Sequence, residues 1–533
     1  MYKRQDEHHD EDMGFLNNSD YAVEATKFGI SKVGDWGYVG FSVDNLESVY
    51  GIPFHGDEHG DEHGDEHGDE EEHDEHGEER IFSTTDSESF TIKGSYNING
   101  SLINKIDFNY RDSDYSLTED HEEEEHHEEE EHDEEEEHEE HAPTVFMNEA
   151  VEYGATFDIS NDSSTQKVVV NFVDEDNSIV GEEAFMNPAN SEEFTIGYYL
   201  SKDLGTFDLD FGFRLDQIER SGSVSEEEHE DDHGDDHGDE HGDVDYYNID
   251  DTTSSFAITL GRDLSDNLGI SLGYASVERL PSSIELFMNG PHMATGRFEV
   301  GDPNLNSETS NNFDITFNFD NGDFYALASF YITDVDNYIA LIDEEDDHMD
   351  EDEHHEDEDE HHEGEDEHHE DEHDDHGHGN LIHANYMQED AEFDGYEIEF
   401  GRSFDLGSGE LALSFGRDVV NAEFADGHYV PRINPARNIY SLVYTQDDLL
   451  FKLMLKDVEK QNDIGEGETA TDAYQMLNTR LTKTFNGMGE GELKVSLFAN
   501  NLLDEVARNH SSFVKNEVPL PGRNYGLKFN LTF

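Results

Sequence analysis

Histidine and carboxylate side chains recur together in this sequence at short, regular spacing. The stretch GDEHGDEHGDEHGDE, residues 56–70, repeats a four-residue unit more than three times. A second stretch, EDHEEEEHHEEEEHDEEEEHEEH, occupies residues 119–141. Imidazole nitrogen and carboxylate oxygen are both ligands of Zn²⁺, which usually takes four of them in a tetrahedron. These residues therefore predict the binding of divalent metal ions.

All but four of the 32 histidines lie in or directly beside five acidic tracts, which hold more than half of the 135 acidic residues. The tracts are residues 6–12, 56–79, 119–141, 226–243 and 343–378. We predict that the last four are disordered loops that capture and concentrate cations. A flexible loop does not select one metal, and Cu²⁺ usually binds such ligands more tightly than Zn²⁺ does. The alternative is a solvated acidic coat, which has no need of imidazole.

The candidate metal ligands form two groups. The tract candidates are His55, His59, His63, His67, His73, His76, His121, His126, His127, His132, His229, His233, His237, His241, His361, His362, His368, His369 and His376. The isolated candidates are Glu285, His292, His383 and His510. A selective site needs ligands that a scaffold holds in place, which favours the isolated group. The alternative for His292 and His510 is that they cap or pack their own loops.

The charge balance restricts the partners. The formal net charge is -106, with 29 basic residues against 135 acidic ones. This excludes ordinary nucleic-acid binding, which needs cations to neutralise phosphate, and it favours cations as partners. The absence of cysteine excludes thiolate zinc sites and disulfides. The chain has no apolar run of about 18 residues for a transmembrane helix, and its first residues lack the apolar core of a secretory signal.

Between the tracts, apolar and polar residues alternate. In FDLDFGFRLD, residues 207–216, every second side chain is apolar, and NYGLKFNLTF, residues 524–533, repeats the pattern. A period of two predicts β-strands. We count about 19 strands, from roughly 21–33 to 524–533, joined alternately by short turns and by long connections. A soluble all-β protein is the alternative to a membrane barrel.

The order of the strands predicts where the tracts lie. In an antiparallel meander, alternate connections lie at opposite ends, and an even number of strands separates each tract from the next. All tracts, and the loops that carry His292 and His510, should therefore lie at one rim. Short turns at one rim and long loops at the other are typical of a transmembrane antiparallel β-barrel. Because single-chain barrels usually have an even number of strands, an odd count indicates truncation at the N-terminus.

Several stretches resemble the barrel of TonB-dependent outer-membrane receptors, most closely their zinc-uptake branch. They are GYVGFSVDNLESVYGIPFH (37–55), ERLPSSIELFMNGPHMATGRFEVGDPNLNSETSNNFDI (278–315), DAEFDGYEIEF (390–400), YVPRINPARN (429–438) and NNLLDEVARNHSSFVKNEVPLPGRNYGLKFNLTF (500–533). The resemblance implies a monomeric 22-stranded barrel in the outer membrane of a Gram-negative bacterium. It also implies an N-terminal plug that contacts a TonB-type energy transducer. These residues contain neither the plug nor about three of the strands.

Within the resembling stretches, we expect one set of residues to hold the loops and barrel together. These are Arg279, Pro281, Glu285, Arg508, Pro519, Pro521 and Arg523.

The resemblance and the tracts together predict a receptor that imports zinc, or another divalent transition metal, with the metal as cargo and no catalytic cofactor. A haem or metal-chelate receptor is an alternative, since haem iron takes an axial ligand such as histidine. A metal-binding surface barrel that transports nothing is an alternative of another class. No Ser/His/Asp arrangement, phosphate-binding glycine loop or HExxH helix stands out, so we expect no enzyme.

Overall fold

The computed structural model of the chain describes residues 16, 18–53, 80–100, 102–122, 143–181, 184–225, 244–344, 381–488 and 491–532. In this part of the chain, one sheet contains 21 strands, accompanied by a single short α-helix and one 3-10 turn. The fold is therefore all-β, as the period-two pattern predicts. None of the helices in these ranges is long and apolar enough to cross a membrane.

Nineteen of the 21 strands, all except β11 and β12, form one antiparallel meander in which each strand pairs with the next. The first half comprises β1 (Tyr21–Gly34), β2 (Gly37–Gly51), β3 (Arg80–Asn97), β4 (Lys105–Glu122), β5 (Thr144–Asp158), β6 (Thr165–Val180), β7 (Ala189–Asp203), β8 (Asp208–Ser225), β9 (Val244–Ser265) and β10 (Leu268–Arg279). The second half comprises β13 (Glu308–Asp320), β14 (Phe324–Asp343), β15 (Ile382–Asp405), β16 (Glu410–Phe424), β17 (Arg437–Gln446), β18 (Leu449–Val458), β19 (Tyr474–Met488), β20 (Gly491–Asn500) and β21 (Asn524–Thr532). This number agrees with the predicted count of about 19.

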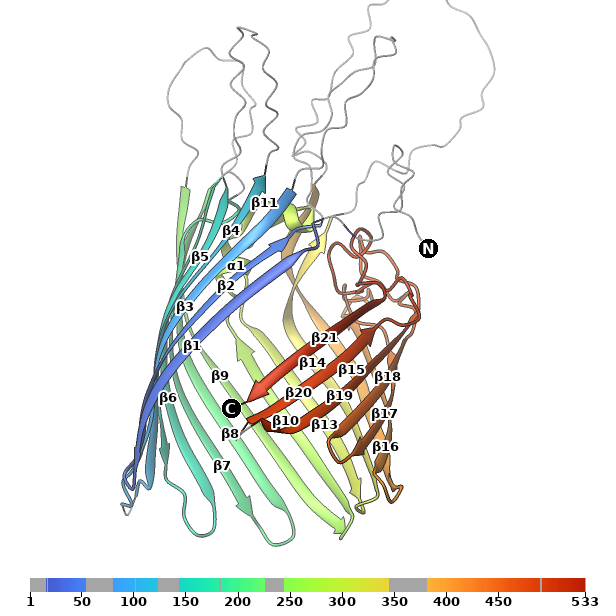
Figure 1. Cartoon of the computed structure of the whole chain (residues 1–533). Helices are drawn as coiled ribbons and strands as arrows, with labels where there is room; N and C mark the ends of the chain where they lie inside the picture. Colours follow the sequence, from blue (N-terminus) through green and yellow to red (C-terminus); the bar gives the residue numbers. More distant parts are fainter. Residues whose placement is uncertain are drawn as a thin grey trace, which may run out of the picture.

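The two rims of the curved sheet differ as strand parity predicts (Figure 1). Short turns join β1 to β2, β3 to β4 and each later pair of this kind at one rim. The strand ends that flank the four tracts, at β2/β3, β4/β5, β8/β9 and β14/β15, lie at the other rim, which we call the tract-bearing rim. The long connections β10–β13 and β20–β21, which carry His292 and His510, are at the same rim.

The predicted loops 56–79, 119–141, 226–243 and 343–378 lie largely outside the described residues. One boundary differs from the prediction. β4 continues through Glu122, which pairs with Arg80 of β3, so the first four residues of the 119–141 tract are strand. A long partner strand supplies backbone hydrogen bonds whatever the side chains are. Composition alone therefore placed the end of β4 too early.

Along β8 the outer face is apolar and the inner face is more polar. Phe213 and Leu215 of β8 are 42% and 39% exposed. Asp216, on the opposite face of the same strand, is buried and accepts a hydrogen bond from Thr195. An exposed apolar band on a closed or curved sheet fits contact with lipid. No backbone pairing joins β1 to β21 within the described ranges, so the sheet curves without closing.

The connection between β10 and β13, residues 280–307, folds inward over the mouth, and we call it the mouth strap. It begins with helix α1 (Ser283–Phe287), which a capping box starts because Ser282 and Glu285 bond reciprocally to backbone N–H groups. Phe287 of α1 packs against Gly222 of β8, where an added Cβ would lie 2.5 Å from the ring. Gly222 is on the face of β8 opposite Phe213, so the helix lies against the inner wall.

The strap continues as a hairpin of β11 (Asn289–His292) and β12 (Arg297–Val300). Met288, just before β11, forms a bridge with Met186 of the β6–β7 connection. β12 pairs with the start of β15 in parallel. Six strands of the meander separate β6 from β15. The strap therefore links two distant parts of the rim by backbone hydrogen bonds, a feature the alternation pattern did not predict.

Candidate functional site

The mouth strap holds an imidazole against a buried carboxylate. His292 ends β11 and Glu299 lies in β12, and His292 Nδ1 is 2.9 Å from Glu299 Oε1. Glu299 is only 3% exposed, and Thr295 also donates to its Oε1. The His292 ring lies 4.7 Å from the ring of Phe185, measured between centroids. Within the described ranges, Nε2 of His292 has no protein hydrogen bond.

This geometry fits a metal ligand. Histidines that bind metal usually bond their second ring nitrogen to a carboxylate, which fixes the ring and raises its basicity. His292 has that partner, and its side chain is 28% exposed, so Nε2 can meet an ion from solvent. One imidazole is not a complete site, however. In the part of the chain that the structure describes, no three His, Cys, Asp or Glu side chains are grouped to hold an ion.

His510 occupies a different environment. Its side chain is fully buried, and Nδ1 is 3.0 Å from Thr471 Oγ1. Nε2 lies 3.1 Å from Glu468 Oε1, without the alignment of a hydrogen bond. The Lys515 ammonium is 2.6 Å from the same oxygen. This arrangement supports the packing alternative for His510, which joins the β18–β19 and β20–β21 connections.

Glu468 is the centre of that buried group. It lies in the β18–β19 connection and accepts bonds from Lys515 and from the backbone N–H groups of Arg432 and Gly465. Burial alone would raise the pKa of this carboxyl group, but His510, Lys515 and the two N–H groups outweigh it and lower the pKa to about 2. The ionised Glu468 carboxylate thus joins the β16–β17, β18–β19 and β20–β21 connections at the rim.

The other candidates have separate places. His383 is exposed at the start of β15 and stacks on Phe298 of β12, with ring centroids 5.2 Å apart. Glu285 receives two bonds from Arg279, at 2.9 and 3.1 Å, and one from the backbone of Ser282. Both of its oxygens are therefore engaged in holding α1 to β10. Of the tract histidines, only His121 falls within the described ranges, as a residue of β4.

Most of the residues expected to hold the loops together make such contacts, whereas the role of Pro519 stays a prediction. Arg279 also bonds Glu308 of β13, and the Pro281 carbonyl accepts from Arg220. Arg508 donates to backbone carbonyls of its own connection, and Arg523 pairs with Asp504.

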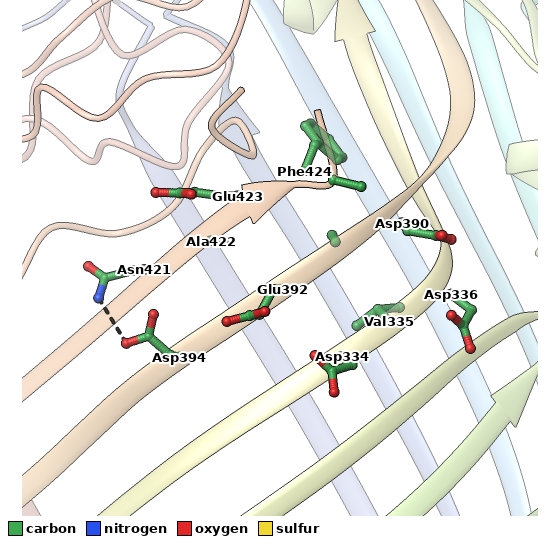
Figure 2. A pocket seen from close by; sticks show the side chains of 12 residues that line it. Asp334, Val335, Asp336, Asp390, Glu392, Asp394, Asn421, Ala422, Glu423 and Phe424 are labelled. Carbon is green, nitrogen blue, oxygen red and sulfur yellow. Dashed lines mark hydrogen bonds between the residues drawn. The ribbon is translucent and has the colours of Figure 1, made fainter. Parts of the chain in front are cut away.

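A group of carboxylates on three neighbouring strands was not predicted. A hollow of about 460 Å³ lies on β14, β15 and β16, close to the tract-bearing rim. Figure 2 shows the side chains that line it. Its acidic side chains are Asp334, Asp336, Asp390, Glu392, Asp394 and Glu423. Asp334, Glu392 and Glu423 are direct cross-strand neighbours, an arrangement that costs stability because like charges face one another. The alternation of acids within 390–394 is the signal that sequence reasoning overlooked.

Comparison with known proteins gives a family match over most of the chain. The model of the family described as TonB dependent receptor-like, beta-barrel, matches residues 16–502. A solved structure titled copper transporter OprC has a TM-score of 0.68 and 14% identity, over 97% of this chain and 72% of that one. The FrpB iron transporter from Neisseria meningitidis, F3-3 variant, has a TM-score of 0.61 and 13% identity, over 97% and 74%.

A third similar structure is the Serratia marcescens hemophore receptor HasR in complex with its hemophore HasA and heme. Its TM-score is 0.59 and its identity 12%, over 95% of this chain and 70% of that one. All three are named as transporters or a receptor rather than as enzymes. At these identities the likeness concerns the fold, whereas the family match spans most of the sequence. The chain therefore belongs to the TonB-dependent receptor-like β-barrel family of the Gram-negative outer membrane.

Proposed function

We propose that this protein is an outer-membrane receptor for the TonB-dependent import of zinc, or of another divalent transition metal. The observation that carries the proposal is the position of the tracts. The strand ends on either side of all four internal tracts lie at the rim that also carries the mouth strap. In a barrel with short turns at the periplasmic end, this rim faces the cell exterior.

The tracts are proposed to act as the capture step. Their many carboxylates attract divalent cations towards the mouth, and salt weakens this attraction through screening. Their imidazoles add affinity for transition metals over Ca²⁺ and Mg²⁺, which prefer oxygen ligands. Because an unperturbed histidine titrates near pH ~6.5, capture should weaken as the medium becomes acidic.

The mouth strap is proposed to act as the selection step. His292 supplies a nitrogen that the scaffold holds in place, and Glu299 orients it. Further ligands would have to come from residues outside the described ranges or from the metal's own chelator. The choice of zinc rests on the histidine-rich composition, and the copper and iron named for the two similar transporters make both metals necessary competitors in any test.

Uptake of labelled zinc by cells that produce the full reading frame tests the proposal. The proton gradient across the inner membrane is left intact and then collapsed, and unlabelled zinc, copper, nickel, cobalt or haem competes. Gradient-dependent uptake that zinc competes best is expected. Preferred competition by haem would support the haem alternative. Zinc that stays at the surface whatever the gradient would identify a metal-binding barrel that transports nothing.

A further inference from the structure

A second cavity lies at the mouth, on the opposite side of the strap from α1. Its volume is about 350 Å³, at the small end of the range for small-molecule sites. Its walls come from the β11–β12 turn with the start of β12, the end of β14, the start of β15, and the β16–β17, β18–β19 and β20–β21 connections. Six separate segments therefore converge on one small space.

A phenyl ring between two guanidinium groups forms one wall. The Phe513 ring centroid lies 4.6 Å from Arg297 Cζ and 4.4 Å from Arg432 Cζ. Arg297 is committed to the protein, because its Nε and Nη2 bind both oxygens of Asp343, at 2.8 and 2.6 Å, and Nη1 donates to the Thr295 carbonyl. The third basic side chain, Lys515, is committed to Glu468.

Arg432 is not committed in this way. Its guanidinium donates one hydrogen bond, to the Leu341 carbonyl, and within the described ranges it forms no ion pair with a carboxylate. Burial lowers the pKa of Arg432, and Asp343 and Glu468 offset this only in part while Arg297 adds to it. A partly desolvated cation with spare N–H donors is unfavourable unless an anion meets it.

The backbone also holds Arg432 in an unusual conformation. Its φ is +64°, in the left-handed region that costs a non-glycine residue roughly 1–2 kcal/mol. The Arg432 N–H donates to both oxygens of Glu468, at 3.1 Å each, which fixes this conformation. Strain that the surroundings maintain is common where a side chain has to face a ligand. Here it directs the guanidinium over Phe513 and towards the cavity.

We propose that this cavity binds a small polycarboxylate that carries the metal, with Arg432 as its main contact. A guanidinium pairs with a carboxylate through two parallel N–H bonds, and Phe513 offers an apolar surface beside them. This inference rests on the proposed function and names the form of its substrate. The bound metal ion also lets a polycarboxylate reach the cavity. The acidic tracts repel a free polyanion, but they repel it much less when the metal ion offsets its negative charge.

Binding of radiolabelled citrate to the purified full chain in detergent tests the proposal, with and without equimolar zinc. We expect zinc-dependent binding of citrate to the wild type, weakened about tenfold or more in Arg432→Gln, as for loss of a charge-assisted bond. Arg432→Lys keeps the charge without the fork and should lie between the two. Lys460→Gln removes an exposed cation from the neighbouring β18–β19 connection and should bind as the wild type does.

Three results would overturn the proposal. The first is that Arg432→Gln binds citrate with the same affinity as the wild type. The second is that the wild type binds no citrate when zinc is present. The third is that equimolar inorganic phosphate displaces the citrate. Circular dichroism of the β-sheet shows that each variant is folded.

Uptake separates this inference from the proposed function. Arg432→Gln should lose uptake of zinc supplied as its citrate complex and keep uptake of zinc supplied as the hydrated ion. If wild-type cells import neither form of zinc, while the purified protein still binds zinc citrate through Arg432, the proposed function is refuted and the proposed binding site is retained. If both forms of zinc are taken up in a gradient-dependent way and Arg432→Gln changes neither uptake, the binding site is refuted and the proposed function is retained.

Discussion

Glu299 Oε1 lies 2.9 Å from His292 Nδ1 across the β11–β12 hairpin, and the protein buries the carboxylate almost completely while the imidazole stays within reach of solvent. The two residues belong to one short hairpin that backbone bonds fix on both sides, to the β6–β7 connection and to β15. The orientation of the imidazole is therefore set before any ion arrives.

Replacing Glu299 with Gln should weaken the selective step. The amide no longer offers the ring a charged hydrogen-bond acceptor, and loss of such a carboxylate partner typically costs about 10–100-fold in metal affinity. The KM for gradient-dependent zinc uptake should rise by about this factor. Asp426→Asn is the matched control, because Asp426 makes the same kind of contact with His428, at 3.0 Å, on an exposed loop. An equal KM for zinc uptake in the two variants would show that His292 is not a metal ligand of the selective step.

Acid should loosen the loops that Glu468 joins. The carboxyl pKa is lowered from 4.5 to about 2, so its stabilisation is fully present above pH 4.5 and is lost as the pH falls towards 2. The difference corresponds to roughly 3 kcal/mol. In Glu468→Gln, residues 459–473 and 501–523 should exchange amide hydrogens faster than in the wild type near neutral pH. This difference in exchange rate between the variant and the wild type should disappear near pH 2. A difference that stays constant from neutral pH to pH 2 would contradict the role of the ionised Glu468 carboxylate.

Gly222→Ala should displace helix α1. The new methyl group would meet the Phe287 ring at 2.5 Å, and overpacking of this kind costs about 1–3 kcal/mol. Limited proteolysis should then cut within residues 280–307 more readily, while the barrel strands stay protected. Gly212→Ala is the control, because Gly212 lies on the same strand and face with nothing within 4 Å of an added Cβ. Equal cleavage of the two variants would show that α1 is not held at Gly222.

Deleting the tracts should impair uptake only when metal is scarce. Removal of residues 56–79 and 346–378 takes away two of the four capture tracts and leaves the strap intact. The second deletion starts after Glu344 because Asp343 binds Arg297 and Glu344 binds Asn385. Labelled zinc uptake should fall at low external zinc and approach the wild-type rate at high zinc. An equal proportional loss at both concentrations would contradict the capture role.

Much of the barrel could be predicted from the sequence because each strand repeats one simple constraint. Lipid outside and a polar interior impose a period of two, so Phe213 and Leu215 share one face and Asp216 the other. The first strand, Tyr21–Gly34, and the last, Asn524–Thr532, begin at the predicted residues. Strand parity then placed the loops of His292 and His510 at one rim.

The mouth strap could not be predicted in the same way. Its short helix depends on a single capping box, and β11 and β12 have four residues each, too few for a period to emerge. Their partners, Met186 and the start of β15, are distant in sequence. For the same reason His292 and His510 looked equivalent, although distant neighbours leave one accessible and bury the other. Arg432 gave no sequence signal, because its left-handed backbone depends on Glu468.

The parallel pairing of β12 with β15 has a consequence for delivery. The 343–378 tract leads directly into β15, whose residue His383 is opposite Phe298, next to Glu299. His376 is seven residues from His383, so the chain cannot separate their Cα atoms by more than about 25 Å. Under the proposed capture role, an ion that this end of the tract releases would start close to His292 rather than in the bulk medium.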